Sequence, residues 1–158
     1  MTVALAEDVV TKLLAYFGTN MPAKLAALNA EYNDGVTLGD LSYYDAEQEE
    51  LPTAASLFVL ADSTDMRERG GGRAWITNRT AITLVVLVTD MNTSALRRKL
   101  YRYLRALVEL LNTGESTPGF PYGVFAMAAS FSPILRDGAN PFFSDARLTF
   151  EAFRQEIF

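Results

Sequence analysis

Ala81-Ile-Thr-Leu-Val-Val-Leu-Val-Thr89, followed closely by the stretch from Ser94 to Leu111, decides the fold that this sequence predicts. The first stretch is an almost unbroken apolar run rich in β-branched residues, which is typical of a buried strand. In the second stretch the apolar residues recur at the spacing of one helix face: Leu96, Leu100, Tyr103, Leu104, Leu107 and Leu111. The sequence therefore predicts a strand that leads directly into an amphipathic helix.

Further strand patterns lie on both sides of this pair. Residues 56–62 predict a buried strand, residues 124–131 a strand that is apolar on both faces, and residues 147–153 a strand with alternating polarity. We therefore expect an α+β fold with a four-stranded, largely antiparallel sheet, made of two β-hairpins joined by one helix. Because strands 81–89 and 124–131 are apolar on both faces, the N-terminal helix or a neighbouring subunit must cover the second face of the sheet.

The N-terminal third predicts two helices and then an irregular segment. Apolar residues at helical spacing run from Val3 to Phe17 and stop at Gly18, and a shorter helix is expected from Pro22 to about Glu31. Residues 32–55 mix turn formers with carboxylates and form an acidic link. We expect a single domain, with a helical part (1–31), this link (32–55) and a β-β-α-β-β core (56–158).

Composition excludes several kinds of chemistry. The chain has 158 residues, of which 49% are hydrophobic and 21% charged, as in one ordinary domain with a packed core. It contains neither cysteine nor histidine, so thiolate nucleophiles and disulfides are absent, and triad hydrolase, zinc or haem chemistry is disfavoured. The N-terminus has no basic segment, and no apolar run approaches the ~18 residues of a membrane span. We expect a soluble protein made inside the cell, without membrane contact.

Charge is distributed unevenly along the chain. Residues 1–56 carry two lysines against nine carboxylates, a net charge of −7, whereas residues 57–113 carry nine basic residues against five acidic ones, a net charge of +4. The central helix supplies Arg97, Arg98, Lys99, Arg102 and Arg105. One interpretation is that this basic face attracts the acidic third of another copy, a second is that it is simply solvated, and a third is that it contacts nucleic acid. A pI near 4.7 argues against general nucleic-acid affinity.

Motifs for catalysis or ligand binding are weak. The triplet Gly70-Gly71-Gly72 lacks the Lys-Ser/Thr of a phosphate loop, and the carboxylates of residues 40–50 lack the spacing of a calcium loop. We expect no enzyme, no cofactor and no metal. The segment Ser63–Gly72 is instead predicted to be a mobile hairpin tip. Our candidates for an interface with another subunit or partner are Arg67, Arg69, Gly70, Gly71, Gly72, Arg98, Arg102 and Arg105.

The order of elements, Leu51-Pro52 ahead of the first strand, the glycine-bearing arm and the pattern Leu96-x3-Leu100-Tyr-x-Tyr-Leu-x2-Leu107-x3-Leu111 together resemble the tail terminator (tail completion) proteins of tailed bacteriophages. The resemblance covers roughly residues 50–158. It implies a structural virion protein, assembled in the host cytoplasm, that forms a hexameric ring at the head-proximal end of the tail. Such a ring stops growth of the tail tube and joins the tail to the neck.

The partners that this resemblance implies are other copies of the chain, the tail tube protein and a neck or connector protein, with genomic DNA only passing through the lumen. The arm Ser63–Gly72 would then become ordered against a neighbouring subunit or the tube. Two alternatives stay open at this point. One is another head–tail connector or neck subunit, and the other is a small ligand-binding or nucleic-acid-binding α+β module.

Overall fold

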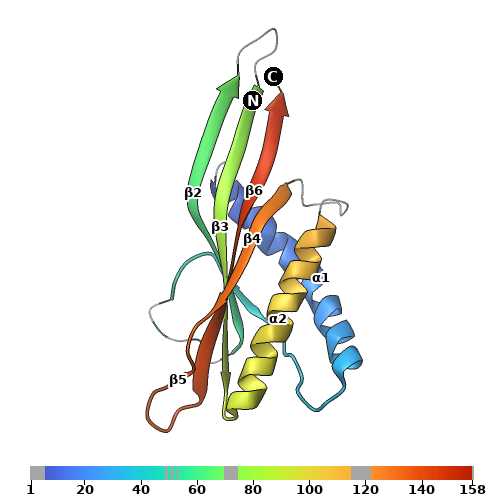
Figure 1. Cartoon of the computed structure of the whole chain (residues 1–158), viewed down its shortest axis with the longest axis vertical. Coiled ribbons are helices and arrows are strands. Elements are labelled where there is room, and N and C mark those ends of the chain that lie inside the picture. Colours follow the sequence, from blue (N-terminus) through green and yellow to red (C-terminus); the bar gives the residue numbers. More distant parts are fainter. Residues whose placement is uncertain are drawn as a thin grey trace.

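In the computed structural model, which describes residues 6–48, 50, 52, 54–69, 75–114 and 122–157, two long helices pack against one mixed six-stranded sheet (Figure 1). Helix α1 spans Ala6–Tyr32 and helix α2 spans Thr93–Gly114. The strands are β1 (Ser42–Tyr44), β2 (Ser56–Arg69), β3 (Trp75–Asp90), β4 (Gly123–Phe131), β5 (Leu135–Arg136) and β6 (Phe142–Ile157). The predicted α+β class is confirmed.

The strand order is β1-β2-β3-β6-β4, with β5 paired to β6. Every pair is antiparallel except β1 with β2, which is parallel. The two expected antiparallel pairs, β2 with β3 and β4 with β6, are present on either side of α2. The expected number of four strands is wrong, because β1 and β5 are too short, at three and two residues, for a periodic pattern to reveal them.

Both helices cover the same face of the sheet. The apolar stripe of α2 is buried as predicted, with Leu96, Leu100 and Leu107 each 0% exposed. Opposite it, β3 and β6 present alternate apolar residues: Ile82, Leu84, Val86, Val88, Ala146, Leu148, Phe150 and Ala152. The hydroxyl of Tyr16 on α1 donates to the carbonyl oxygen of Leu110 on α2 at 2.7 Å. This bond ties the two helices together across the core.

Helix α1 is continuous, so the predicted break at Gly18 and the separate second helix from Pro22 are wrong. One buried apolar stripe runs through both positions: Leu13, Phe17, Met21, Leu25 and Leu28. Packing of that stripe on the sheet and on α2 outweighs the local preference of glycine and proline to end a helix. The side chain of Asn20 also donates to the carbonyl of Tyr16 at 2.8 Å within this helix.

Strands β2, β3 and β6 extend well beyond the helices (Figure 1). The prediction of a mobile hairpin tip over Ser63–Gly72 is wrong for residues 63–69. These residues form part of strand β2 and pair with residues 75–81 of β3. Backbone pairing needs no apolar side chains, so polar residues continue the ladder after a bulge between Ala61 and Ser63. Gly70, Gly71 and Gly72 lie outside the described residues.

Candidate subunit interface

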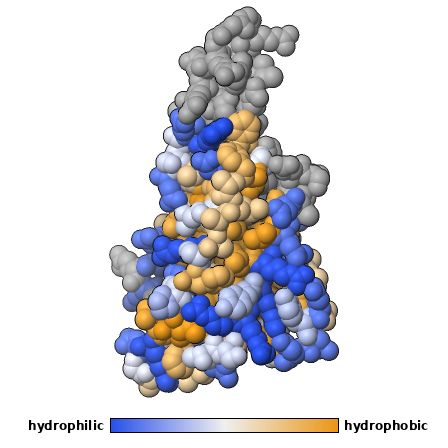
Figure 2. All heavy atoms as spheres, viewed as in Figure 1, coloured by the Kyte–Doolittle hydropathy of each residue, from blue (hydrophilic) through white to orange (hydrophobic). Residues whose placement is uncertain are grey.

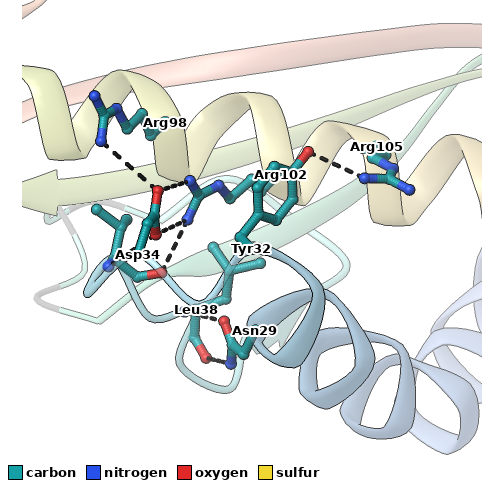
Figure 3. A network of polar contacts seen from close by, with 8 residues as sticks. Asn29, Tyr32, Asp34, Leu38, Arg98, Arg102 and Arg105 are labelled. Carbon is teal, nitrogen blue, oxygen red and sulfur yellow. Dashed lines mark hydrogen bonds and ion pairs between the residues drawn. The ribbon is translucent and has the colours of Figure 1, made fainter.

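The basic face of α2 binds the loop that follows α1 (Figure 3). The guanidinium of Arg102 donates to both carboxylate oxygens of Asp34, at 2.9 and 2.5 Å, and to the carbonyl of Val36 at 2.9 Å. It also lies 3.9 Å from the ring centroid of Tyr32. The Arg102 side chain is only 7% exposed. Arg102 is therefore neither solvated nor free for another copy, because a loop distant in sequence covers it within the same subunit.

Local geometry holds this loop in place. The side chain of Asn29 accepts a hydrogen bond from the Leu38 backbone at 2.8 Å and donates to the Leu38 carbonyl at 3.0 Å. Asn33 and Gly35 have φ values of 41° and 83°, which turn the chain sharply around Asp34. Glycine and asparagine tolerate this left-handed region better than other residues. The sequence Asn33-Asp34-Gly35 thus aims the carboxylate at α2.

Charge pairing explains the protonation state of Asp34. Hydrogen bonding by Arg102 lowers the pKa of Asp34 to about 2, assisted by the Val36 backbone and by the nearby charge of Arg98. The Arg98 guanidinium lies 3.7 Å from the carboxylate, and its side chain is 55% exposed. Asp34 is therefore an anion at neutral pH, and Arg98 is the more accessible of its two cationic partners.

Arg105 is also occupied within the chain. Its guanidinium donates to Glu31 at 2.9 and 3.1 Å and to Glu109 at 2.7 Å, and hydrogen bonding by Glu31 above all raises the pKa of Arg105. Glu109 also pairs with Lys24 on α1. For Arg102 and Arg105, the acidic partners expected from a second copy thus lie in the same subunit.

Of the five interface candidates in the predicted arm, only the backbones of Arg67 and Arg69 are described. Arg67 and Arg69 lie in β2, paired with residues 77 and 75 of β3, and their side chains are outside the part of the chain that the structure describes. Gly70, Gly71 and Gly72 are also outside it. The described structure therefore brings none of these five residues together with the arginines of α2.

Strand β4 was expected to be buried on both faces and is instead exposed. It is the last strand in the sheet order, so only β6 pairs with it among the described residues. Phe125, Met127 and Phe131 are 37%, 37% and 40% exposed, and none of its nine residues is charged. Ala126 has a φ of 57° at a bulge between Phe125 and Ala128. Edge strands normally carry charges that prevent pairing with other chains, whereas β4 has no charge but does have a bulge.

Apolar side chains of β4 and α2 that are only partly covered form a surface that we call the seam. The rings of Tyr101 and Phe131 pack edge to face, with 5.1 Å between their centroids. Tyr101 is nevertheless 54% exposed. The members of the seam are Tyr101, Leu104, Val108, Val124, Met127 and Phe131. Figure 2 shows a band of hydrophobic residues on this face, along the course of β4. At the end of the seam next to Phe131, the guanidinium of Arg97 donates to the carbonyl of Ser132 at 3.0 Å.

The opposite face of the sheet carries a hollow of about 380 Å³. Its floor consists of the apolar residues Phe58, Leu60, Val85 and Leu87, which alternate along β2 and β3 with residues that face the helices. Its rim includes Glu47, Glu50, Asp62, Asp145 and Arg147. Arg147 lies 3.5 Å from Asp145, and Asp62 accepts a hydrogen bond from the Thr83 hydroxyl at 2.6 Å. The spacing of the carboxylates in residues 40–50 gives no sign of this hollow, since residues from β2, β3 and β6 and from the segment before β2 line it together.

No group of three or more acidic, histidine or cysteine side chains among the described residues could hold a metal ion. None of the described helices is long and apolar enough to cross a membrane. The surfaces that stand out are thus the seam, the hollow and the protruding end of the sheet.

No protein-family model and no curated protein matches the chain. Among solved structures, the chain is similar to one described as "Virion of native gene transfer agent (GTA) particle". The two chains are 13% identical, the comparison covers 85% of this chain and 90% of that chain, and the TM-score is 0.32. Because the TM-score is this low, the similarity establishes neither a common fold nor a common function.

Proposed function

We propose that this protein is a structural subunit of a phage-like virion, and that it forms a ring at the head-proximal end of the tail. In this role it terminates growth of the tail tube and joins the tail to the neck. The observation that carries the proposal is the exposed seam on the edge strand β4. An uncharged edge strand of nine residues with three half-exposed large side chains is unfavourable on a free monomer. Assembly with other subunits would cover it.

A second feature supports a role in assembly. The end of the sheet formed by β2, β3 and β6 projects past the helices, where none of the described helices packs on it (Figure 1). Sheet surface of this kind gains stability by contact with a neighbour. In the proposed ring, the end of the β2–β3 hairpin contacts an adjacent subunit or the tail tube. The order of elements, which resembles that of tail terminators, is consistent with this arrangement.

Assembly of the purified protein is the first test. We expect native mass spectrometry to detect a closed homo-oligomer, most simply a hexamer, whose population rises with protein concentration. Only monomer at both low and high concentration would contradict the proposal. Hydrogen exchange on the free and assembled forms then tests the hairpin, whose backbone amides in residues 63–69 should gain protection on assembly.

Tail length is the functional test. Deletion of the gene for this protein should give particles whose tail tubes have uncontrolled length and do not join heads. Tubes of normal length that fail to join heads would instead indicate a neck or connector subunit. Salt-sensitive DNA binding by the isolated protein, without any oligomer, would favour a nucleic-acid-binding module.

A further inference from the structure

We infer that the seam of one subunit binds the hollow of the next, so that successive copies join through opposite faces of their sheets. This inference rests on the proposed function as a self-assembling ring subunit, and it names the two surfaces that meet. The occupant of the hollow is thus a second copy of this chain, which contributes the aromatic pair Tyr101 and Phe131 together with Arg97.

The seam has the composition of the centre of a protein interface. It is aromatic and aliphatic, and Tyr101 is more than half exposed although it packs against Phe131. Tyrosine and arginine are the residue types that most often dominate binding energy at interfaces. Arg97 adds a positive charge at the end of the seam next to Phe131, and none of the six seam residues is acidic.

The hollow has the complementary composition. Its floor is apolar, with Leu60 and Val85 half-buried and Phe58 and Leu87 buried. Four carboxylates and a single arginine stand around that floor, so its net charge is negative. Among the described residues, no ion pair joins Glu47 or Glu50 to a basic side chain of the same subunit. These two carboxylates remain available to a cationic partner.

Charge decides which surfaces pair. Two seams facing each other would oppose Arg97 with Arg97, and two hollows would oppose carboxylates with carboxylates, so like pairing is unfavourable. Pairing of a seam with a hollow places apolar surface on apolar surface and opposite charges at the rim. Since the two patches differ and lie on opposite faces of one sheet, the contact is heterologous. Repetition of a heterologous contact gives a closed ring or an open filament.

A charge exchange between copies tests this inference. Arg97→Glu reverses the charge beside the seam. Glu47→Arg together with Glu50→Arg reverses the charge at the rim of the hollow. Either variant alone should weaken assembly, with a rise in the dissociation constant of about tenfold or more. An equal mixture of the two should assemble as the wild type does. In alternating order, each reversed seam meets a reversed hollow, and each unchanged seam meets an unchanged hollow.

Two controls keep the test specific. Glu7→Arg with Asp137→Arg makes the same change in net charge as the hollow variant, at exposed sites outside both surfaces, and should leave assembly unchanged. Tyr101→Ser removes apolar surface without changing charge and should weaken assembly in every mixture. Circular dichroism confirms that each variant is folded, and Arg97→Gln replaces Arg97→Glu if the latter does not fold.

The outcomes separate the inference from the proposed function. A wild-type protein that never assembles contradicts both. A wild-type oligomer that tolerates the seam and hollow variants, or whose variants stay dissociated when mixed, overturns the seam–hollow contact and leaves the ring intact. Restored assembly in the mixture, with no effect of the control pair, supports the contact directly.

Discussion

Replacement of Gly18 by alanine tests the least expected feature of the fold, the unbroken helix α1. Gly18 lies in the interior of α1, is exposed, and a Cβ built on it meets nothing within 4 Å. Alanine there gains helix propensity and costs no steric clash, so Gly18→Ala should stabilise the protein by about 0.5 to 1 kcal/mol. For a chain of this size that corresponds to a rise in melting temperature of roughly 1 to 4 °C.

The same substitution at two other glycines provides a matched control. Gly35 and Gly138 have φ values of 83° and 60°, and a Cβ at either meets nothing within 4 Å. Alanine in this left-handed region costs about 1 to 2 kcal/mol, so Gly35→Ala and Gly138→Ala should destabilise the protein. All three variants add one methyl group in open space. Only the backbone conformation differs, and it should reverse the sign of the effect.

Urea and thermal unfolding, followed by far-ultraviolet circular dichroism at one fixed protein concentration, measure these differences. If the helix instead ended at Gly18, that residue would adopt the left-handed conformation common after a helix. Gly18→Ala would then destabilise the protein by as much as Gly35→Ala does. That result would refute the continuous helix and restore the two shorter helices that the sequence alone predicts.

Three further predictions test the contacts around α2. Arg102→Ala should lower the free energy of unfolding far more than Arg98→Ala, because Arg102 is buried with three hydrogen bonds whereas Arg98 is mostly exposed; equal effects in urea unfolding would contradict this. Since Arg102 lowers the pKa of Asp34 to about 2, this carboxylate stabilises the fold fully above about pH 5 and loses its effect as the pH falls toward 2. Asp34→Asn should therefore be less stable than wild type at pH 7, with a difference that shrinks in acid; a constant difference in thermal melts would count against it. Tyr16→Phe should cost about 0.5 to 1.5 kcal/mol in unfolding free energy, because it removes the buried bond to the Leu110 carbonyl, and an unchanged value would show that water or another group replaces it.

Elements whose signals are local could be predicted from the amino-acid sequence. The apolar spacing of residues 96–111 predicts α2 and its buried face, and the run 81–89 predicts the central strand. Both predictions are confirmed, since each pattern extends over enough residues to bury one face whatever the neighbours are. The alternation in residues 147–153 likewise predicts β6, although β6 begins earlier, at Phe142.

Features that depend on contacts between distant residues emerge only when the chain is folded. Gly18 and Pro22 are breakers by local rules, yet they lie within α1 because the buried stripe on either side continues across them. Residues 124–131 look like a buried strand, but the order β3-β6-β4 places them at an edge, and no local pattern encodes strand order. Val124, Met127 and Phe131 of this strand therefore form part of the seam.

Arg102 illustrates the same limit for the candidate interface. Its helical position opposes the apolar stripe of α2, so the sequence predicts exposure, whereas the loop around Asp34, 68 residues earlier in the chain, buries it. The hollow likewise draws its floor from β2 and β3 and its rim from residues as far apart as Glu47 and Arg147. Periodicity reports which face of an element is apolar, but the packing of elements far apart in sequence decides which charges are satisfied internally and which remain for a partner.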